Sequence, residues 1–450
     1  MPRREPNRRL AALLTDAQWS AADLARAVNA LGAAQGLDLH YERTAVAHWL
    51  TGSRPHGPVP ELAAQALSRR TRRLITAEDT GLAPHGRIGV LPEPAPAAEG
   101  DPVRRLNALA RDDTDPAHRA HLARTAYTLS PVTVPDWAAR VPLPRAGSGH
   151  RIVDADVEGL QDMTRTFACL CDRRGGGHAR TALTSYLADD ATALAAAPAS
   201  RTLHRQILVN CAQLTHILAA MTADAGHQGL AQQYFRAALG LSLRADDRTS
   251  HAVTLRAMST QALRLGHTHH AGELARAAHE SAGTTAPAAT LSYLLAQRAL
   301  TSAADREPRR ALADLNAAEQ QHSRATSAPG PFSTYPQAGL DYQRAQILHA
   351  LGDQQEAVSA LRQAARHRPP SQRRLYVLTQ LRLSDVLLDT GHVEEACAYA
   401  RLALDHYPHL HSVRADKALA HLINRLRAFP RQRHAALALE QAYQLKQDWS

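Results

Sequence analysis

The segment GDQQEAVSALRQAA, residues 352–365, contains a spacing of small residues that recurs along the second half of the chain. Its glycine is followed by alanine after five and again after twelve residues, with an apolar residue between the two alanines. The same spacing begins at residues 226, 266, 306, 352, 391 and 430, although the copies at Arg306 and Pro430 lack the glycine. Six copies in one register predict a repeat architecture.

The two alanines also predict how the repeats pack. Residues seven apart lie on one face of an α-helix, and small side chains there allow a second helix to approach closely. The glycine allows the turn between the two helices of a pair. We therefore expect an all-α solenoid of stacked helix pairs over residues 201–450, in which each pair buries its apolar face on the next.

This order of glycine, alanine, apolar residue and alanine resembles the second helix of the tetratricopeptide repeat. Pro369 and Pro408 lie where that helix ends in the family. The resemblance spans about residues 205–450. Successive copies begin 39 to 46 residues apart, whereas the family repeats about every 34 residues, which implies longer helices here.

Two segments precede the repeats. Residues 81–103 are rich in proline, glycine and alanine and predict an extended linker. Residues 104–200 predict a helical connecting region, with a helix over 104–129 and an irregular leading repeat in RRGGGHARTALTSYL (173–187), where Ala182 and Tyr186 match the repeat positions. No Lys-Ser/Thr follows the triple glycine, so it predicts a turn between helices rather than a phosphate-binding loop.

Residues 1–80 predict a separate domain of four or five short helices. The segment SAADLARAVNAL begins with Ser20 and Asp23, which are spaced as a capping box. A turn through Gly32 and Gly36 is expected to lead into the next helix, YERTAVAHWLTGSRP (41–55). Gly52 is expected to end that helix.

The helix within residues 41–55 has two unlike faces. Val46, Trp49 and Leu50 form an apolar stripe that predicts docking on the preceding helix. Arg43, Thr44 and His48 lie on the other face, with Ala45 beside them. Residues 1–75 hold eleven arginines against six acidic residues, and this local excess favours an acidic partner such as nucleic acid.

A short two-faced helix among others in a basic segment is typical of a helix-turn-helix unit. In such a unit Arg43 can donate two hydrogen bonds to guanine, Thr44 can contact a thymine methyl group, and His48 can bond to a base or a phosphate. Ser53 and Arg54 would then lie over the sugar-phosphate backbone, and Ser20 completes the predicted DNA-contacting set. The alternative is a small helical bundle with solvated arginines and no nucleic-acid contact.

The whole chain resembles the actinobacterial regulators that join a Cro/CI-like (XRE-type) helix-turn-helix domain to a tetratricopeptide-repeat domain. The residues that carry this resemblance are SAADLARAVNAL, YERTAVAHWLTGSRP, ITAEDTGL and GGGHARTAL. It implies that the helix with Arg43, Thr44, Ala45 and His48 enters the major groove of double-stranded DNA. It also implies a homodimer on an inverted repeat and a repeat domain that senses a peptide, a protein or a small molecule. The turn GAAQGLDLH is longer than the family's usual turn.

In tetratricopeptide repeats the first helix of each pair lines a concave groove. The resemblance implies that the residues ten and six positions before each glycine face this groove. They are His216, Arg256 and Tyr342 at the first offset and Thr260, Gln346 and Asp385 at the second. Such side chains can hold an extended peptide, and the alternative is a solvated face without a ligand.

The remaining features predict that the protein is not an enzyme. The chain has no nucleotide-binding loop, GxSxG or HExxH motif, and its 25 histidines show no metal-ligand spacing, so neither a metal nor another cofactor is expected. It has four cysteines without a CxxC pair and no apolar run of about eighteen residues, which predicts reduced thiols, no membrane span and a cytoplasmic location.

These patterns together predict a cytoplasmic, DNA-binding transcriptional regulator with a dimerising or effector-sensing repeat domain. The alternative is a tetratricopeptide protein-interaction scaffold that does not bind DNA.

Overall fold

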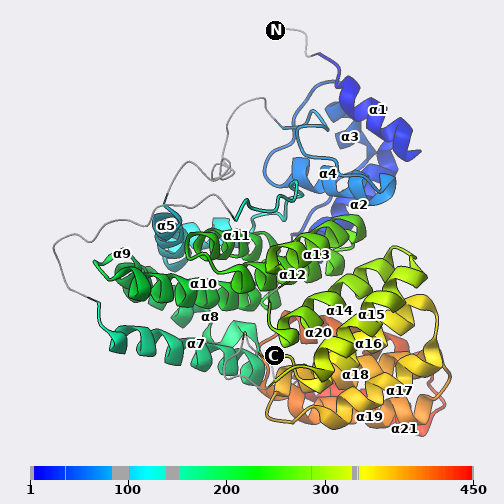
Figure 1. Ribbon diagram of the computed structural model, residues 1–450. Helices are drawn as coiled ribbons and strands as arrows, with labels where there is room; N and C mark the ends of the chain where they lie inside the picture. The colour runs from blue at the N-terminus through cyan, green and yellow to red at the C-terminus, as the bar shows by residue number, and fades with distance from the viewer. Residues whose placement is uncertain are drawn as a thin grey trace.

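The computed structural model describes residues 5–35, 37–83, 101–137, 152–284, 286–326, 332 and 334–447. Within these ranges the regular secondary structure is helical throughout, as the sequence predicts (Figure 1). An N-terminal helical domain lies against one side of a long array of helix pairs. The expected linker, residues 81–103, falls largely on residues 84–100, which lie outside the described residues.

The N-terminal domain consists of α1 (Arg8–Ala17), α2 (Ala21–Ala34), α3 (Arg43–Leu50) and α4 (Val59–Thr71). Its core is the set of leucine, valine and alanine side chains that the helical periodicity predicts, together with Trp49. The predicted capping box at the start of α2 is present. The expected turn at Gly32 is wrong, because α2 continues through this residue. A Cβ atom at Gly32 would lie 2.7 Å from the side chain of Leu39, so the glycine lets the α2–α3 connection pack closely on α2.

The expected helix over 104–129 is two helices and an extended segment. Helix α5 (Pro102–Thr114) ends at Asp115, whose side chain caps α6 (Pro116–Ala123). Asp115 is extended because the residue before a proline disfavours the helical conformation. Residues 125–137 then run without helix across α11, and we call them the strap.

The helix pairs follow one another along the chain. The leading pair is α7 (Asp154–Arg174) and α8 (Gly176–Tyr186), followed by a π-helical turn (Leu187–Ala191) and α9 (Thr192–Ala196). The six later pairs are α10 (Arg201–Asp224) with α11 (Gln228–Arg244), α12 (Arg248–Arg264) with α13 (Thr268–Ala282), α14 (Ala288–Ala304) with α15 (Pro308–Ser323), α16 (Gln337–Leu351) with α17 (Gln354–His367), α18 (Arg373–Asp389) with α19 (Val393–His406), and α20 (Val413–Leu426) with α21 (Arg433–Gln447).

The repeat register predicted from the sequence is confirmed. In all six later pairs both alanines of the second helix are at most 2% exposed, from Ala231 and Ala238 in α11 to Ala435 and Ala442 in α21. The turn glycines have φ between 80° and 98°. Arg306 stands at the glycine position of its repeat and adopts the same left-handed conformation, with φ 61°.

The register expected for the leading repeat is wrong. Ala182 is exposed, and the turn is made by Gly175 with φ 86°, so the small buried residue of α8 is Ala179. Gly176 and Gly177 begin α8 and pack closely on other helices. A Cβ atom at Gly176 would lie 2.4 Å from the carbonyl oxygen of Met221 in α10.

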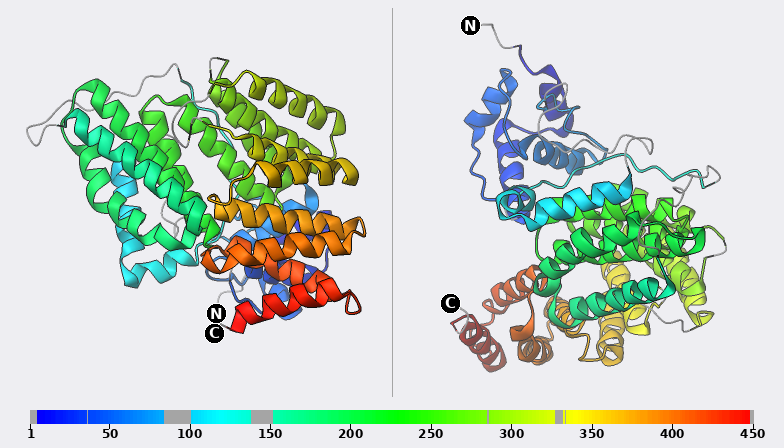
Figure 2. Two further views of the ribbon diagram at one scale, coloured as in Figure 1. Left: turned by 90° about the horizontal axis from the view of Figure 1, so that it is seen from below. Right: turned by 90° about the vertical axis from the view of Figure 1, so that its left-hand side faces the viewer.

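The leading pair also contacts the far end of the array. The Gly177 amide donates to the carbonyl of His411, 2.9 Å away, and the His411 amide donates to the carbonyl of Arg174 at 2.7 Å. Helix α7 packs along α18, so the first pair lies beside the fifth and sixth later pairs (Figure 2). The solenoid therefore closes on itself.

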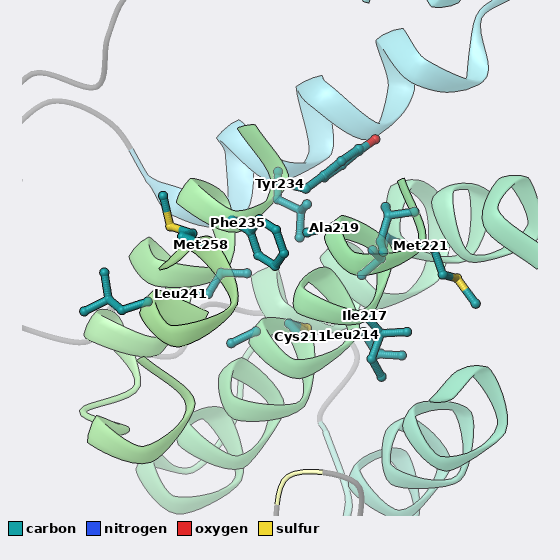
Figure 3. Close-up of a cluster of buried hydrophobic side chains, with 14 of the residues drawn as sticks. Cys211, Leu214, Ile217, Ala219, Met221, Tyr234, Phe235, Leu241 and Met258 are labelled. Atoms are coloured by element: carbon teal, nitrogen blue, oxygen red, sulfur yellow. The ribbon is translucent and has the colours of Figure 1, made fainter. Parts of the chain in front are cut away.

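The largest core cluster is centred on α10, α11 and α12. Cys211, Leu214, Phe235, Leu241 and Met258 pack there (Figure 3). Tyr234 points from α11 toward α5, where its hydroxyl donates to the Asp113 carboxylate at 2.7 Å. Arg180 of α8 donates to the same carboxylate oxygen at 2.5 Å. A buried ion pair thus joins α5 and α8, and Tyr234 adds α11.

A buried polar network joins the N-terminal domain to the strap and the repeats. Gln65 of α4 accepts a hydrogen bond from Gln35, which directly follows α2, and donates to the carbonyl of Tyr127 in the strap. The Tyr127 amide donates to the Gln35 side chain at 3.2 Å. His267, between α12 and α13, lies 3.2 Å from Gln65 and stacks on the Tyr127 ring. Each buried amide group of Gln35 and Gln65 therefore has a partner, which fixes how the domain sits on the array.

None of the helices in the described ranges has the length and apolar character that crossing a membrane requires.

Candidate functional site

The first candidate site is the outer face of α3. The backbone before this helix is fixed by Asn29 of α2, whose side chain donates to the carbonyl of Tyr41 at 2.8 Å and accepts from its amide at 2.9 Å. The Tyr41 ring packs edge-to-face on Trp49, with 5.3 Å between the centroids. Val46 and Trp49 are buried in the domain core. The α2–α3 connection is therefore ordered by side chains, although it is long.

The polar residues of α3 lie where the two-faced pattern predicts them. Arg43, Thr44 and His48 are exposed, and Ala45 is half-buried. Leu50, expected in the apolar stripe, is only half-buried. Helix α3 lies on the side of the domain that faces away from α12 and α13 (Figure 1). The repeats therefore leave this face uncovered.

The other predicted DNA-contacting residues, Ser20, Ser53 and Arg54, differ in exposure and in hydrogen bonding. After the helix ends, the Ser53 amide donates to the carbonyl of His48 at 2.9 Å, and the Arg54 side chain is exposed. Ser20 is exposed, but its hydroxyl is engaged by the capping box: it donates to the Asp23 carboxylate at 2.6 Å and accepts from the Asp23 amide at 3.3 Å. The same interactions, with the nearby Arg26, lower the pKa of Asp23.

The second candidate site is the inner face of the repeats. The six residues predicted to face it are all half-buried: His216, Arg256, Thr260, Tyr342, Gln346 and Asp385. They lie on four first helices, α10, α12, α16 and α18. Helix α14, the first helix of the third later pair, carries none of them. The structure divides them into three groups rather than one continuous row of free side chains.

The first group is centred on Arg256. Its guanidinium lies over the ring of Tyr293, 3.7 Å from the centroid, and donates to Gln343 at 2.8 Å. Gln343 in turn donates to Gln297 at 3.0 Å, and Thr260 donates to the same Gln297 oxygen at 3.1 Å. This network connects α12, α14 and α16. The Tyr293 ring and the Gln343 amide group hold the guanidinium of Arg256 in position.

His216 lies beside this group. Its Nδ1 atom is 3.1 Å from the hydroxyl of Thr254, and its ring packs edge-to-face on Phe235 and Phe332. Burial, together with the nearby cation of Arg256, lowers the pKa of His216 to about 4. The side chain is therefore neutral at physiological pH and acts as a hydrogen-bonding group.

Asp385 belongs to an ion-paired group at the C-terminal end of the array. It pairs with Arg382 at 2.8 Å and with Arg425 of α20 at 2.5 Å. These pairs hold Arg425, whose pKa is raised by Asp385 and Asp389 although burial opposes its charge. Asp385 thus joins two repeats, and its carboxylate is already engaged.

Tyr342 belongs to a third group that the sequence analysis missed. Three arginines, from α12, the end of α17 and α20, interact electrostatically with it: Arg264, Arg368 and Arg414. Arg374 of α18 lies close to these three arginines. Only the closure of the solenoid brings these helices together, so no short sequence pattern could have indicated the cluster. Gln346, one turn from Tyr342, is half-buried on the same helix.

Among the described residues, no group of three or more His, Cys, Asp or Glu side chains is placed to hold a metal ion.

Comparison with known proteins recognises two segments of the chain. Residues 10–83 match the family model of the SP15 N-terminal domain, and residues 342–369 match the tetratricopeptide repeat. The chain is a helical tetratricopeptide-repeat protein with an SP15 N-terminal domain. No curated protein matches the chain. A solved structure described as the crystal structure of APC/C hetero-tetramer Cut9-Hcn1 is 12% identical, with a TM-score of 0.35, and the alignment covers 81% of this chain and 63% of that chain.

The tetratricopeptide match contains most of α16 and all of α17, and therefore includes Tyr342 and Gln346. These two predicted groove residues lie in a recognised repeat. The match over residues 10–83 contains α2 and α3 entirely. Because it is a match to the SP15 N-terminal domain, the narrower helix-turn-helix assignment stays a prediction.

Proposed function

We propose that this tetratricopeptide-repeat protein is an interaction protein whose inner face binds an extended segment of a partner. The observation that supports this proposal is the half-buried state of all six predicted groove residues on the first helices of the repeats. Half-buried polar groups on a rigid scaffold can bond to a peptide backbone without a large loss of side-chain entropy. Neither this function nor the second candidate below involves catalysis.

A displayed peptide library, selected on the full chain, tests the proposal. The affinities of the selected peptides are then measured by fluorescence anisotropy for the wild type, Gln346→Ala and Arg256→Ala. We expect each variant to bind at least about fivefold more weakly, as for a lost hydrogen bond in an interface. The matched control is Leu312→Ala, because Leu312 is 43% exposed on the outer helix α15.

Unchanged binding in both groove variants, or an equal loss in the Leu312→Ala control, would contradict the proposal. The proposal would also be contradicted if no selected peptide showed saturable binding.

The second candidate function is recognition of double-stranded DNA by α3, as in a transcriptional regulator. The specific observation that favours it is the exposure of Arg43, Thr44 and His48 over a buried Val46 and Trp49. A guanidinium, a hydroxyl and an imidazole on one exposed helix face suit base edges in a major groove. In this second function the protein would bind an inverted repeat as a homodimer. Light scattering should then give twice the monomer mass.

Duplex binding at two salt concentrations tests this candidate, with sites taken from a genome-wide map of bound DNA. Arg43→Ala is expected to weaken binding to the preferred site by about 1–3 kcal/mol, the value of a bidentate contact to guanine. The control Arg165→Ala removes an exposed arginine of α7, which is paired with Asp162 and lies outside the N-terminal domain.

An equal loss on all duplexes would make Arg43 a phosphate contact. Absence of salt-dependent duplex binding would favour the interaction function alone.

A further inference from the structure

A narrow cleft lies between the end of α4 and the start of α13, where the N-terminal domain meets the repeats (Figure 1). Three arginines at the end of α4 and just after it line one side: Arg69, Arg72 and Arg73. The turn at Gly266 and the first turn of α13 line the other side, together with Leu129 of the strap. We call this feature the joint cleft, because both parts of the chain contribute to it.

Arg69 reaches across the joint cleft to the repeats. A Cβ atom at Gly266 would lie 3.2 Å from the Cζ atom of Arg69 and 3.4 Å from its Nε atom. The guanidinium therefore packs against the backbone of the turn between α12 and α13. Partial burial at this contact lowers the pKa of Arg69, although the residue keeps exposed surface. The contact thus holds one cation at the junction of the two parts.

The arginines of the joint cleft are only partly neutralised. Arg73 pairs with Asp16 of α1 at 2.7 Å. Within the described residues, no hydrogen bond or ion pair engages the guanidinium of Arg69 or that of Arg72. Glu273 is the only carboxylate among the residues that line the cleft. With the histidines uncharged, three arginines against the carboxylates of Asp16 and Glu273 leave an excess of one positive charge.

The start of α13 adds hydrogen-bond donors to the cleft. Its N-cap residue, His267, makes no capping hydrogen bond with its side chain, whose Nε2 atom instead lies 3.2 Å from Gln65. The first amides of α13 therefore have no side-chain acceptor, and amides at the start of a helix favour an anion. This helix start supplements the arginines and would not form a site without them.

The backbone of a nucleic acid suits these features. Each phosphodiester group carries one negative charge, which equals the excess charge of the cleft. Guanidinium groups donate hydrogen bonds in pairs to phosphoryl oxygens. The cleft is too narrow for a base. The arginines also continue the positive excess of residues 1–75, a segment that includes the exposed Arg43 of α3.

We propose that Arg69 and Arg72, with the start of α13, bind a backbone phosphodiester group of double-stranded DNA without regard to its sequence. This inference rests on DNA as the partner in the second candidate function, but it does not require α3 to read the bases. It also gives the repeats a direct part in DNA binding. A duplex bound in the joint cleft would hold α4 against α13.

Fluorescence anisotropy on the full chain tests this site. The probes are two labelled DNA duplexes of equal length and unrelated sequence, and a labelled oligoglutamate peptide of the same charge. We expect Arg69→Gln and Arg72→Gln each to bind both duplexes at least about fivefold more weakly. Each variant should also reduce the slope of log K against log salt concentration by about one, as for one lost phosphate contact.

The matched control is Arg401→Gln, which removes the same charge from an exposed arginine of α19, at the end of the molecule opposite the N-terminal domain (Figure 1). Thermal unfolding without DNA separates binding from folding. If Arg69→Gln does not fold, Arg72→Gln still decides the question. The guanidinium of Arg72 has no partner to lose, and its left-handed backbone, with φ 54°, disfavours glutamine and arginine alike.

Arg43→Ala distinguishes this site from α3. If only the joint cleft binds DNA, Arg43→Ala leaves duplex binding unchanged while Arg69→Gln weakens it. Unchanged affinity and salt dependence in both Arg69→Gln and Arg72→Gln overturn the proposal, whatever Arg43→Ala does. Absence of duplex binding by the wild type, an equal loss in Arg401→Gln, or equal affinity for the oligoglutamate peptide overturns it as well.

Discussion

At the turn between the two helices of a repeat, the backbone conformation limits which residue can occupy the position. Gly391 has φ 80°, and a Cβ atom added there would meet no heavy atom within 4 Å. Glycine is therefore favoured at this position by the left-handed backbone conformation, since a larger side chain would not clash with its neighbours. Arg306 adopts the same conformation without being glycine, which a non-glycine residue does only at a cost in free energy.

Gly391→Ala should lower the free energy of unfolding by about 1–2 kcal/mol, because alanine disfavours the left-handed region. Gly159→Ala is the matched control: Gly159 lies inside α7, and its Cβ atom would also meet nothing within 4 Å. There alanine should raise the stability by about 1 kcal/mol, since it is a better helix former. The midpoints of urea unfolding measure both changes, and a shift of the same sign in the two variants would contradict this explanation.

Among the elements, the six later helix pairs were predictable and the connecting region was not. The spacing of Ala357 and Ala364 is local information, and burial of both follows directly from helical periodicity. The strap has no such signal, because its partners are in distant helices. The same holds for the leading repeat, where Gly175 turns the chain and contact with His411 determines the register. Local patterns specify elements, whereas contacts between distant segments are set by the assembled fold.

The strap is held against α11 by a close backbone approach. A Cβ atom at Gly229 would lie 2.1 Å from the carbonyl oxygen of Thr125. The Thr128 amide also donates to Gln232 at 2.8 Å, and the Gln232 side chain donates back to the carbonyl of Thr128 at 2.6 Å. Tyr127 of the strap also bonds to Gln35 and Gln65. The strap therefore connects α11 to the N-terminal domain.

Gly229→Ala should displace the strap and loosen the N-terminal domain, because backbone atoms cannot yield as a flexible side chain can. We expect faster hydrogen exchange at the amides of Tyr127 and Thr128 and a loss of about 2 kcal/mol or more in stability, as for other overpacked sites. The control is Gly272→Ala in α13, where the Cβ atom would make an ordinary contact of 3.5 Å with Asp305. Unchanged exchange in the strap of Gly229→Ala would show that this contact does not hold the domain.

The candidate site was only partly predictable. The exposed face of α3 follows from the periodicity of residues 43–50, so Arg43, Thr44 and His48 could be placed from the sequence. The partners of the groove residues could not, since Gln297 and Gln343 reach Arg256 and Thr260 from other repeats. The arginines around Tyr342 were missed for the same reason.

At the scale of the whole molecule, buried histidines connect stability to pH. Burial lowers the pKa of His216 and His251 to about 4 and that of His267 to about 3. The unfolded value is about 6.5, so below this pH the unfolded chain binds protons that the folded chain does not. The stability contributed by these neutral histidines is complete above about pH 6.5 and is lost as the pH falls toward 4.

We therefore expect the free energy of unfolding to decrease steeply between pH 6.5 and 4.5, with up to about 1.4 kcal/mol per pH unit from each of the three histidines. His267→Gln should reduce this slope, because glutamine keeps a donor for Gln65 and does not titrate. His40→Gln is the control, since the His40 side chain is 84% exposed. Urea unfolding at several pH values measures the slopes, and the same slope in wild type and His267→Gln would contradict the assignment.

The bonds between residues 174–177 and His411 also affect the order in which the molecule can be completed. In an open array each unit needs only its neighbours, so early units can reach their final state while later ones are still being synthesised. Here the carbonyl of His411, which accepts the hydrogen bond from the Gly177 amide, emerges from the ribosome only after five of the six later pairs. Final assembly of the earliest pair must therefore wait until almost the whole chain has been translated, and a truncated product would expose the glycine-rich start of α8.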